Sequence, residues 1–321
     1  MRLPELRRVL QTIVLASLPA AGCLGTNADD CLERTAQRTL VIDLPTDGPT
    51  ELKVESCRVD VDACLDLCRA AMRRAMLSEA PGGCDVTFQA GHVNVDVTYT
   101  YYNGDGCVVA GRRPAGLQAL RGGGGDRAAD WLARAAWLEA ASVHSFVQLA
   151  RELEQAGAPR TLVAWAMSSA NDELRHATMV TRLALRYGAT PQVPEIAPVS
   201  GRSLEALALE NAVEGCVRET WGALLALWQS RTALDPDVRR VFAQIARDEL
   251  RHAALAWAVD RWLAPQLTGE ALDRVAAARH VAMEDLTRSH EAIPALGLPD
   301  LNAARALLGR AQSLVWRGAS S

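Results

Sequence analysis

The sequence lacks an excess of basic residues. Its 34 Lys and Arg stand against 38 Asp and Glu, which gives a net charge of −4 at pH 7, and Lys53 is the only lysine. Proteins that neutralise nucleic-acid phosphates carry the opposite balance, so the charge argues against nucleic acid as a partner. Apolar residues are not scarce, at 49% of the chain with 22% charged, which excludes a largely disordered protein.

The sequence also lacks an uninterrupted apolar run long enough to cross a bilayer. Its best N-terminal candidate, residues 9–21, is broken by Gln11 and Pro19. Three arginines precede this stretch within the first eight residues, and small residues follow it. A basic start, an apolar middle and a small-residue end have the form of a secretory signal.

The end of that stretch, Ala20-Ala21-Gly22 before Cys23, resembles the lipobox of bacterial lipoproteins. Ala20 departs from the family, which usually has a larger aliphatic residue there. The resemblance implies that residues 1–22 are a signal peptide and that Cys23 carries the lipid that anchors the protein to a membrane. No Asp follows Cys23 directly, so we expect an outer-membrane lipoprotein that faces the periplasm or the exterior. An ordinary cleaved signal or a weak transmembrane anchor is the alternative.

A four-cysteine metal site is missing as well. The only short cysteine spacing joins Cys64 and Cys68, and no second pair or nearby histidine completes a zinc site. An even number of cysteines in about 80 residues instead favours three disulfides, with 15 pairings open. The six cysteines of this group are Cys31, Cys57, Cys64, Cys68, Cys84 and Cys107.

Residues 23–118 are expected to form this cysteine-rich α+β domain. Strands are predicted near 39–44 and 51–56, and a helix over 61–76. Alternating apolar residues predict a hairpin of 85–89 with 92–102. No catalytic constellation occurs in this domain.

A run of four glycines at 122–125 marks a flexible linker, taken as 119–126. Composition changes after it, since all eight Trp lie beyond the linker. The fold class predicted from there on is mainly α. Helices over 127–156, 159–187, 203–232 and 236–263 are expected to form a four-helix bundle within residues 127–265, followed by accessory C-terminal helices in 266–321.

The bundle region contains the same six residues twice, Asp-Glu-Leu-Arg-His-Ala at 172–177 and at 248–253. Each copy separates a Glu and a His by three positions: Glu173 from His176, and Glu249 from His252. On an α-helix that spacing puts both side chains on one face, about one turn apart. Two such pairs on facing helices predict a metal site inside the bundle.

An acid also precedes the Glu of each copy at nearly the same distance, Glu139 by 34 residues and Glu214 by 35. In each predicted helix the acid interrupts an apolar, core-facing stripe. Unpaired buried carboxylates are costly, whereas two divalent cations would neutralise four of them. The predicted metal ligands are Glu139, Glu173, His176, Glu214, Glu249 and His252.

Three nearby residues are weaker candidates. Glu210 lies one turn before Glu214 and is either an alternative ligand or a solvated acid. His144 and Glu219 each follow an upstream acid by five residues, which on an α-helix places them too far round to face the same site. Cys216 is expected to stay a free thiol that faces away from the metals.

The duplicated Asp-Glu-x-Arg-His pattern with its upstream acids resembles the ferritin-like superfamily of di-iron carboxylate proteins. The resemblance implies that Glu173 and Glu249 bridge the metals. It implies too that Asp172 and Asp248 hydrogen-bond the far nitrogen of a ligand histidine. Arg175 and Arg251 are expected to pair with those two aspartates.

The resemblance further implies two iron ions, with manganese as the alternative, and O2 or peroxide as reaction partners. The activity expected is that of a di-iron oxidoreductase of the ferroxidase or oxygenase type, acting on iron or an organic substrate in the cell envelope. The alternative is a lipoprotein that binds metal without catalysis, or a structural or binding lipoprotein that uses its cysteine-rich domain. The sequence names no protein partner.

Overall fold

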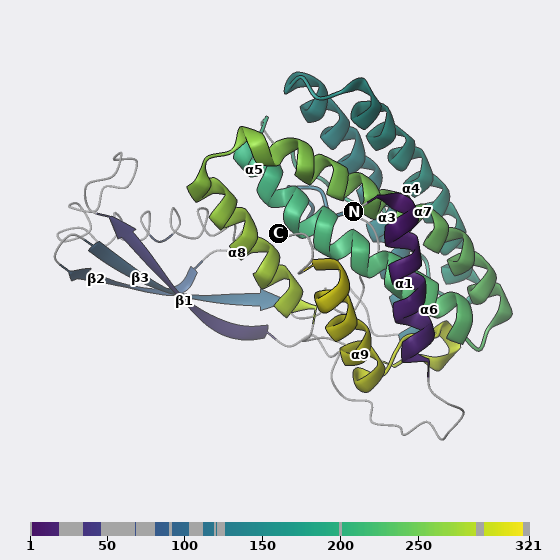
Figure 1. Cartoon of the computed structure of the whole chain (residues 1–321). Helices are drawn as coiled ribbons and strands as arrows, with labels where there is room; N and C mark the ends of the chain where they lie inside the picture. Colours follow the sequence, from purple (N-terminus) through teal and green to yellow (C-terminus); the bar gives the residue numbers. More distant parts are fainter. Residues whose placement is uncertain are drawn as a thin grey trace. The chain divides into compact units, whose positions relative to one another are not determined.

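The computed structural model describes two compact units of the chain, which is mainly helical, as predicted (Figure 1). One unit comprises Cys31–Asp105, and the other Met1–Asp30 with Gly106–Ser321. The residues whose placement is described are 2–18, 35–45, 68, 81–89, 92–102, 112–118, 120, 126–198, 201–286 and 292–316.

The smaller unit contains a three-stranded antiparallel sheet in the order β1-β3-β2. Its strands are β1 (Thr35–Pro45), β2 (Pro81–Gln89) and β3 (His92–Tyr102), and the side chain of Val95 in the central strand is buried. The predicted hairpin is therefore present, although β2 begins earlier than expected.

Most of the predicted cysteine framework lies outside the described residues, as do the strand expected at 51–56 and nearly all of the helix expected at 61–76. Cys68 lies in helical backbone and is disulfide-bonded. The three-disulfide framework remains a prediction.

The larger unit begins its main helices with α3 (Arg127–Gln155) and α4 (Arg160–Arg186), which pack along each other. The Asp126 carboxylate starts α3 by accepting hydrogen bonds from two free backbone N–H groups of the first turn. Gly157 reverses the chain between the helices at φ 74°, a left-handed conformation that glycine adopts without strain.

The third helical segment is continuous but not uniform. It consists of α5 (Leu204–Glu210), a π-helical stretch η3 (Asn211–Glu219) and α6 (Thr220–Thr232). A short turn leads to α7 (Pro236–Leu263), which has proline at its first position, where the missing N–H costs nothing. The four predicted long helices thus coincide with helical segments, but the π-helical interior of the third was not predicted.

C-terminal elements then cover part of this core, as expected for the accessory region. They are η4 (Ala264–Gln266), α8 (Gly269–Asp285), η5 (Pro294–Leu296), α9 (Leu301–Ala311) and η6 (Gln312–Trp316).

The N-terminal helix α1 (Leu3–Ser17), within the expected signal peptide, packs against α6, α7 and α9 in the larger unit. Four of its apolar side chains have 0% exposure: Leu6, Leu10, Ile13 and Val14. Among the helices described, none combines the length and apolarity that crossing a membrane requires.

The division between the units falls before the glycine run, earlier than the expected boundary at 118. Residues 112–118 belong to the helical unit, where Gln118 N–H donates to the Glu195 carbonyl at 2.9 Å and Arg112 is 1% exposed. A buried arginine contact with α5, described below, holds this segment in place.

Candidate metal centre

The two copies of the repeated motif lie on α4 and α7 and turn their Glu and His side chains inward. Glu173, His176 and His252 are 0% exposed, and Glu249 is 2% exposed. Both helices present the Glu and the His from one face because residues three apart are neighbours on an α-helix. The motif therefore brings two carboxylates and two imidazoles into the interior.

These side chains form two groups that could hold metal ions. One consists of Glu139, Glu173, His176 and Glu249, and the other of Glu219, Glu249 and His252. Within each group the ligand atoms lie within 4.8 Å of one another, and every member is buried. Glu249 belongs to both groups, so one carboxylate could bind two ions.

The first histidine faces the cluster through Nδ1. This atom lies 3.4 Å from Glu139 Oε2, 3.3 Å from Glu249 Oε1 and 3.8 Å from Glu173 Oε2. An atom arranged in this way can act as one ligand in a ring of carboxylate oxygens.

The second histidine, His252, repeats this geometry. Its Nδ1 lies 2.9 Å from Glu173 Oε1, 3.4 Å from Glu249 Oε1 and 3.8 Å from Glu219 Oε2. Glu173 and Glu249 each approach both histidines, which is the arrangement that bridging carboxylates require.

The residues fit a metal pair because their inner atoms have no other partner. The buried side-chain atoms without a hydrogen bond include both carboxylate oxygens of Glu173, Glu219 and Glu249, and Nδ1 of both histidines. Buried polar atoms are almost always satisfied, so unpartnered atoms that converge on one volume are those expected of a site that could hold a cation. Carboxylate and imidazole donors together suit iron, manganese or zinc.

The outer nitrogen of each histidine is held by the aspartate of the other motif. His176 Nε2 lies 3.2 Å from Asp248 Oδ2, and His252 Nε2 lies 3.3 Å from Asp172 Oδ2. An ionised carboxylate only accepts hydrogen bonds, so Nε2–H is the donor, and in the neutral imidazole the Nδ1 lone pair faces the cluster. The expected aspartate–histidine contacts are present, and they cross between α4 and α7.

The motif arginines close this arrangement at the surface. Arg251 Nη2 lies 2.7 Å from Asp172 Oδ2, and its Nη1 lies 2.9 Å from Asp248 Oδ1. Arg175 also contacts both aspartates. The expected ion pairs with both arginines are present, and the histidine hydrogen bonds together with the arginine charges lower the pKa of both aspartates.

Without a cation the acids separate into two classes by pKa. Burial, reinforced by the charge of Glu173, raises the pKa of Glu139 well above its usual value, and burial beside Glu249 does the same for Glu219. Burial and the charge of Glu249 oppose ionisation of Glu173 too, but the two neighbouring imidazoles lower its pKa to about 2.

Burial acts on the pKa of the histidines in the opposite direction from its effect on the acids. Burial favours neutral imidazole, yet the surrounding carboxylates raise the pKa of His176 and His252 well above the usual value. Protons on two acids and two imidazoles therefore balance the charge that two divalent cations would otherwise balance.

The position of Glu214 differs from the prediction, because Glu219 occupies the place expected for it. Glu219 lies 13 residues before α6 ends, and Glu249 lies 13 residues after α7 begins, so the two stand level across the turn. In η3, hydrogen bonds span five residues, so each residue turns the chain by less than in an α-helix. Glu219 was predicted to point away from the site on the basis of the α-helical rotation of about 100° per residue, which does not apply in η3.

Glu214 and Glu210 have structural partners instead. Glu214 accepts a hydrogen bond from Arg113 N–H at 3.1 Å and lies 3.5 Å from Arg218 Nε. Glu210 is a buried partner of Arg112, and this pairing lowers its pKa although burial alone would raise it. Glu210 is therefore neither a ligand of the cluster nor a solvated acid.

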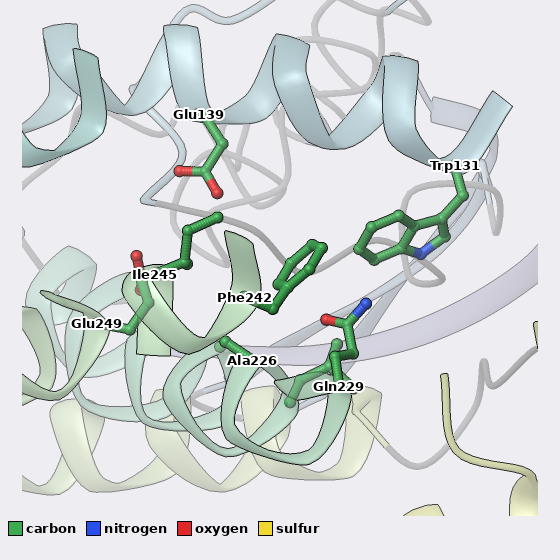
Figure 2. A pocket seen from close by; sticks show the side chains of 9 residues that line it. Trp131, Glu139, Ala226, Gln229, Phe242, Ile245 and Glu249 are labelled. Atoms are coloured by element: carbon green, nitrogen blue, oxygen red, sulfur yellow. The ribbon is translucent and has the colours of Figure 1, made fainter. Parts of the chain in front are cut away.

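A small pocket reaches the cluster beside Glu139 and Glu249. Its volume is about 260 Å³ when the open solvent at its mouth is counted. The part enclosed by protein has room for about one water molecule. Figure 2 shows Trp131 and Glu139 extending from one helix toward Phe242 and Glu249 of another. The lining residues are Trp131, Glu139, Gly222, Leu225, Ala226, Gln229, Phe242, Ile245 and Glu249.

His144 is exposed and lies outside both groups, and Cys216 is a buried free thiol that is not part of them either. No protein-family model, curated protein or solved structure matches the chain.

Proposed function

We propose that this chain is a ferritin-like di-metal carboxylate protein. Helices α3, α4, the α5-η3-α6 segment and α7 are its four-helix bundle, and two iron ions, or manganese in their place, are its cofactors. The observation that carries the proposal is the convergence of unpartnered carboxylate oxygens and two imidazole nitrogens in a buried volume. Packing alone gives no reason to bury such atoms unsatisfied.

The residues divide between the two ions. Glu139 and His176 would hold one ion, and Glu219 and His252 the other, with Glu173 and Glu249 between them. Asp248 and Asp172 fix the histidine tautomers from outside, which keeps Nδ1 free to bind. When bound, a redox-active metal pair supplies electrons to O2 or peroxide, and iron or an organic molecule is the proposed electron donor.

The pocket favours a small oxidant. Its walls are mostly apolar and end at two carboxylates, and its enclosed part has room for about one water molecule. O2 or peroxide fits this entrance, whereas a larger organic substrate requires the lining side chains to move.

The proposal includes the expected secretory signal and lipidated Cys23, which would put this function in the cell envelope, in a lipid-anchored outer-membrane protein with a disulfide-rich N-terminal domain. The proposal keeps this localisation. Its test is replacement of Cys23 by Ser, which should release the protein from membranes.

Metal analysis of the purified protein tests the central proposal. We expect two iron or manganese ions per chain, and consumption of O2 or peroxide when the reduced protein is exposed to either. Glu249→Ala should lose both ions, whereas Glu214→Gln is the matched control on the third helix and should keep them. A protein that binds metal but consumes neither oxidant would be a metal-stabilised binding protein, and one that binds no metal would refute the proposal.

A further inference from the structure

Arg112 is a buried cation from a segment that precedes the four long helices. Its guanidinium binds Glu210 in a bidentate manner, with Nε 2.8 Å from Oε1 and Nη2 2.6 Å from Oε2. Nη2 also donates to Asn211 Oδ1 at 3.3 Å. These contacts hold the last residue of α5 and the first residue of η3.

The neighbouring backbone extends this hold. Arg113 N–H donates to Glu214 Oε2 at 3.1 Å, and Arg112 N–H donates to Ser142 Oγ of α3 at 2.8 Å. Asn211 Nδ2 in turn donates to the Ala256 carbonyl of α7 at 3.0 Å. Residues 112–113, called here the arginine strap, thus tie the start of η3 to α3, while Asn211 ties it to α7.

The arginine strap holds the start of η3, and the winding of η3 determines where Glu219 points. π-Helical turns are rare and need support from their surroundings. At Gly215 a Cβ would lie 2.7 Å from Ala256 Cβ and 2.8 Å from Asn211 Oδ1, so η3 is packed too closely on α7 for any side chain. Both carboxylate oxygens of Glu219 lack hydrogen-bond partners, so no hydrogen bond corrects their position if the helix backbone shifts.

Arg112 is also linked to the same half of the centre through an aromatic ring. Its guanidinium carbon lies 5.8 Å from the centroid of Phe146, whose ring centroid lies 4.9 Å from that of His252. Burial opposes the charge on Arg112, but Glu210, Glu219 and Glu214 raise its pKa, so the cation persists. A buried ion pair adds little stability compared with an apolar pair. Stability alone therefore does not explain why an arginine and a glutamate are buried together at this place.

We propose that Arg112 is a positioning residue for one half of the metal centre: it fixes η3 so that Glu219 meets His252. This inference rests on the proposed metal pair and assigns to Arg112 a role at the Glu219–His252 site only. Glu139 and His176 come from α3 and α4 and not from η3.

The test is Co²⁺ titration of the full-length metal-free chain, followed by visible absorption and ion counting. We expect Arg112→Met to weaken the second bound ion by about 10- to 100-fold, as loss of an outer partner does, with little change in the first. Arg112→Met combined with Glu210→Leu removes both buried charges, so no unpaired carboxylate destabilises the protein, and it should show the same selective loss. Arg202→Met is the control, since Arg202 binds Glu152 and Glu210 but comes from outside the strap.

Equal weakening of both ions, or two unchanged ions in the folded double variant, would overturn the inference. Hydrogen exchange of metal-free protein gives a readout that does not need metal: amides of 211–219 should exchange faster in both Arg112 variants, while those of α3 and α4 should not. A wild type that binds no Co²⁺ would refute the proposed function. The exchange result would then decide alone, and unchanged protection of 211–219 would reject the role of Arg112.

Discussion

The two halves of the candidate centre use the same six-residue motif but place their upstream acid in different ways. In the first half, Glu139 lies in the uninterrupted α-helix α3. In the second half, Glu219 is the last residue of the π-helical stretch η3. A repeated motif fixes geometry only within its own helix, and the rest of the site depends on how the partner helix is wound.

The most damaging change to both halves is removal of Glu249, the carboxylate that the two groups share. We expect Glu249→Ala to weaken binding of both ions by more than about 100-fold, because loss of a mere outer partner already costs about 10- to 100-fold. Glu139→Ala should weaken only one ion to that extent. Calorimetric titration with Mn²⁺ measures both, and retention of either ion by Glu249→Ala would contradict the shared role.

Variants of Glu219 and Glu214 test the structure against the sequence prediction, because the structure puts Glu219 in the cluster and the spacing predicted Glu214. Glu219→Gln should abolish the second ion and spare the first, whereas Glu214→Gln should leave both because glutamine can still accept from Arg113 N–H. Ion counting after gel filtration is sufficient. If Glu214→Gln loses the second ion instead, the winding of η3 in the metal-bound protein differs from that described here.

This pair of residues also shows how far the sequence could lead. The mainly helical class, the four long helices and the inward-facing Glu and His pairs followed from periodicity and from residues three apart. The π-helical winding did not, because it results from contacts with Arg112 and α7 that are remote in sequence. One local signal was available: Glu219 and Glu249 lie equally far from the turn that joins their helices.

Removing metal should make stability depend on pH. Glu139, Glu219, His176 and His252 have raised pKa values in the folded metal-free protein. Groups with raised pKa contribute stability that is complete below their unfolded pKa, near 4.5 for Glu and 6.5 for His, and lost as pH rises through the folded pKa.

The metal-free protein should therefore be less stable at pH 8 than at pH 5.5, by roughly 1.4 kcal/mol for each unit of pKa shift that is crossed. Below pH 4 the lowered pKa of Asp248, about 2, acts in the opposite direction, because its stabilising charge is lost as pH falls. Urea unfolding at several pH values measures both limbs. Loading with Mn²⁺ should remove the dependence near neutrality and release about four protons per metal pair.

Replacing either outer aspartate by asparagine should weaken the ion bound by the histidine on the other helix. Asp248→Asn should weaken the ion held by His176, which is on α4, and Asp172→Asn the ion held by His252, which is on α7. The expected loss is about tenfold in each case, at the lower end for an outer partner, because asparagine keeps one accepting oxygen. Site-resolved Co²⁺ spectra distinguish the halves, and a loss confined to the mutated helix would argue against the crossed contacts.

The smallest expected effect concerns the pocket, which meets the centre at Glu139 and Glu249 and not at Glu219. A Cβ at Gly222 would lie 3.5 Å from Glu249 Oε2, an ordinary contact, so Gly222→Ala should fold and bind both ions normally. It should nevertheless slow oxidation by O2 or peroxide a few-fold, because the added methyl group occupies part of a space with room for about one water molecule.

Gly309→Ala is a suitable control, since a Cβ there meets nothing within 4 Å. Stopped-flow measurement of the reduced, metal-loaded proteins gives the rate, and metal analysis of the same samples excludes loss of ions as the cause. An unchanged rate for Gly222→Ala would mean that the reaction partner enters elsewhere. The Glu139 half would then be no more accessible than the Glu219 half.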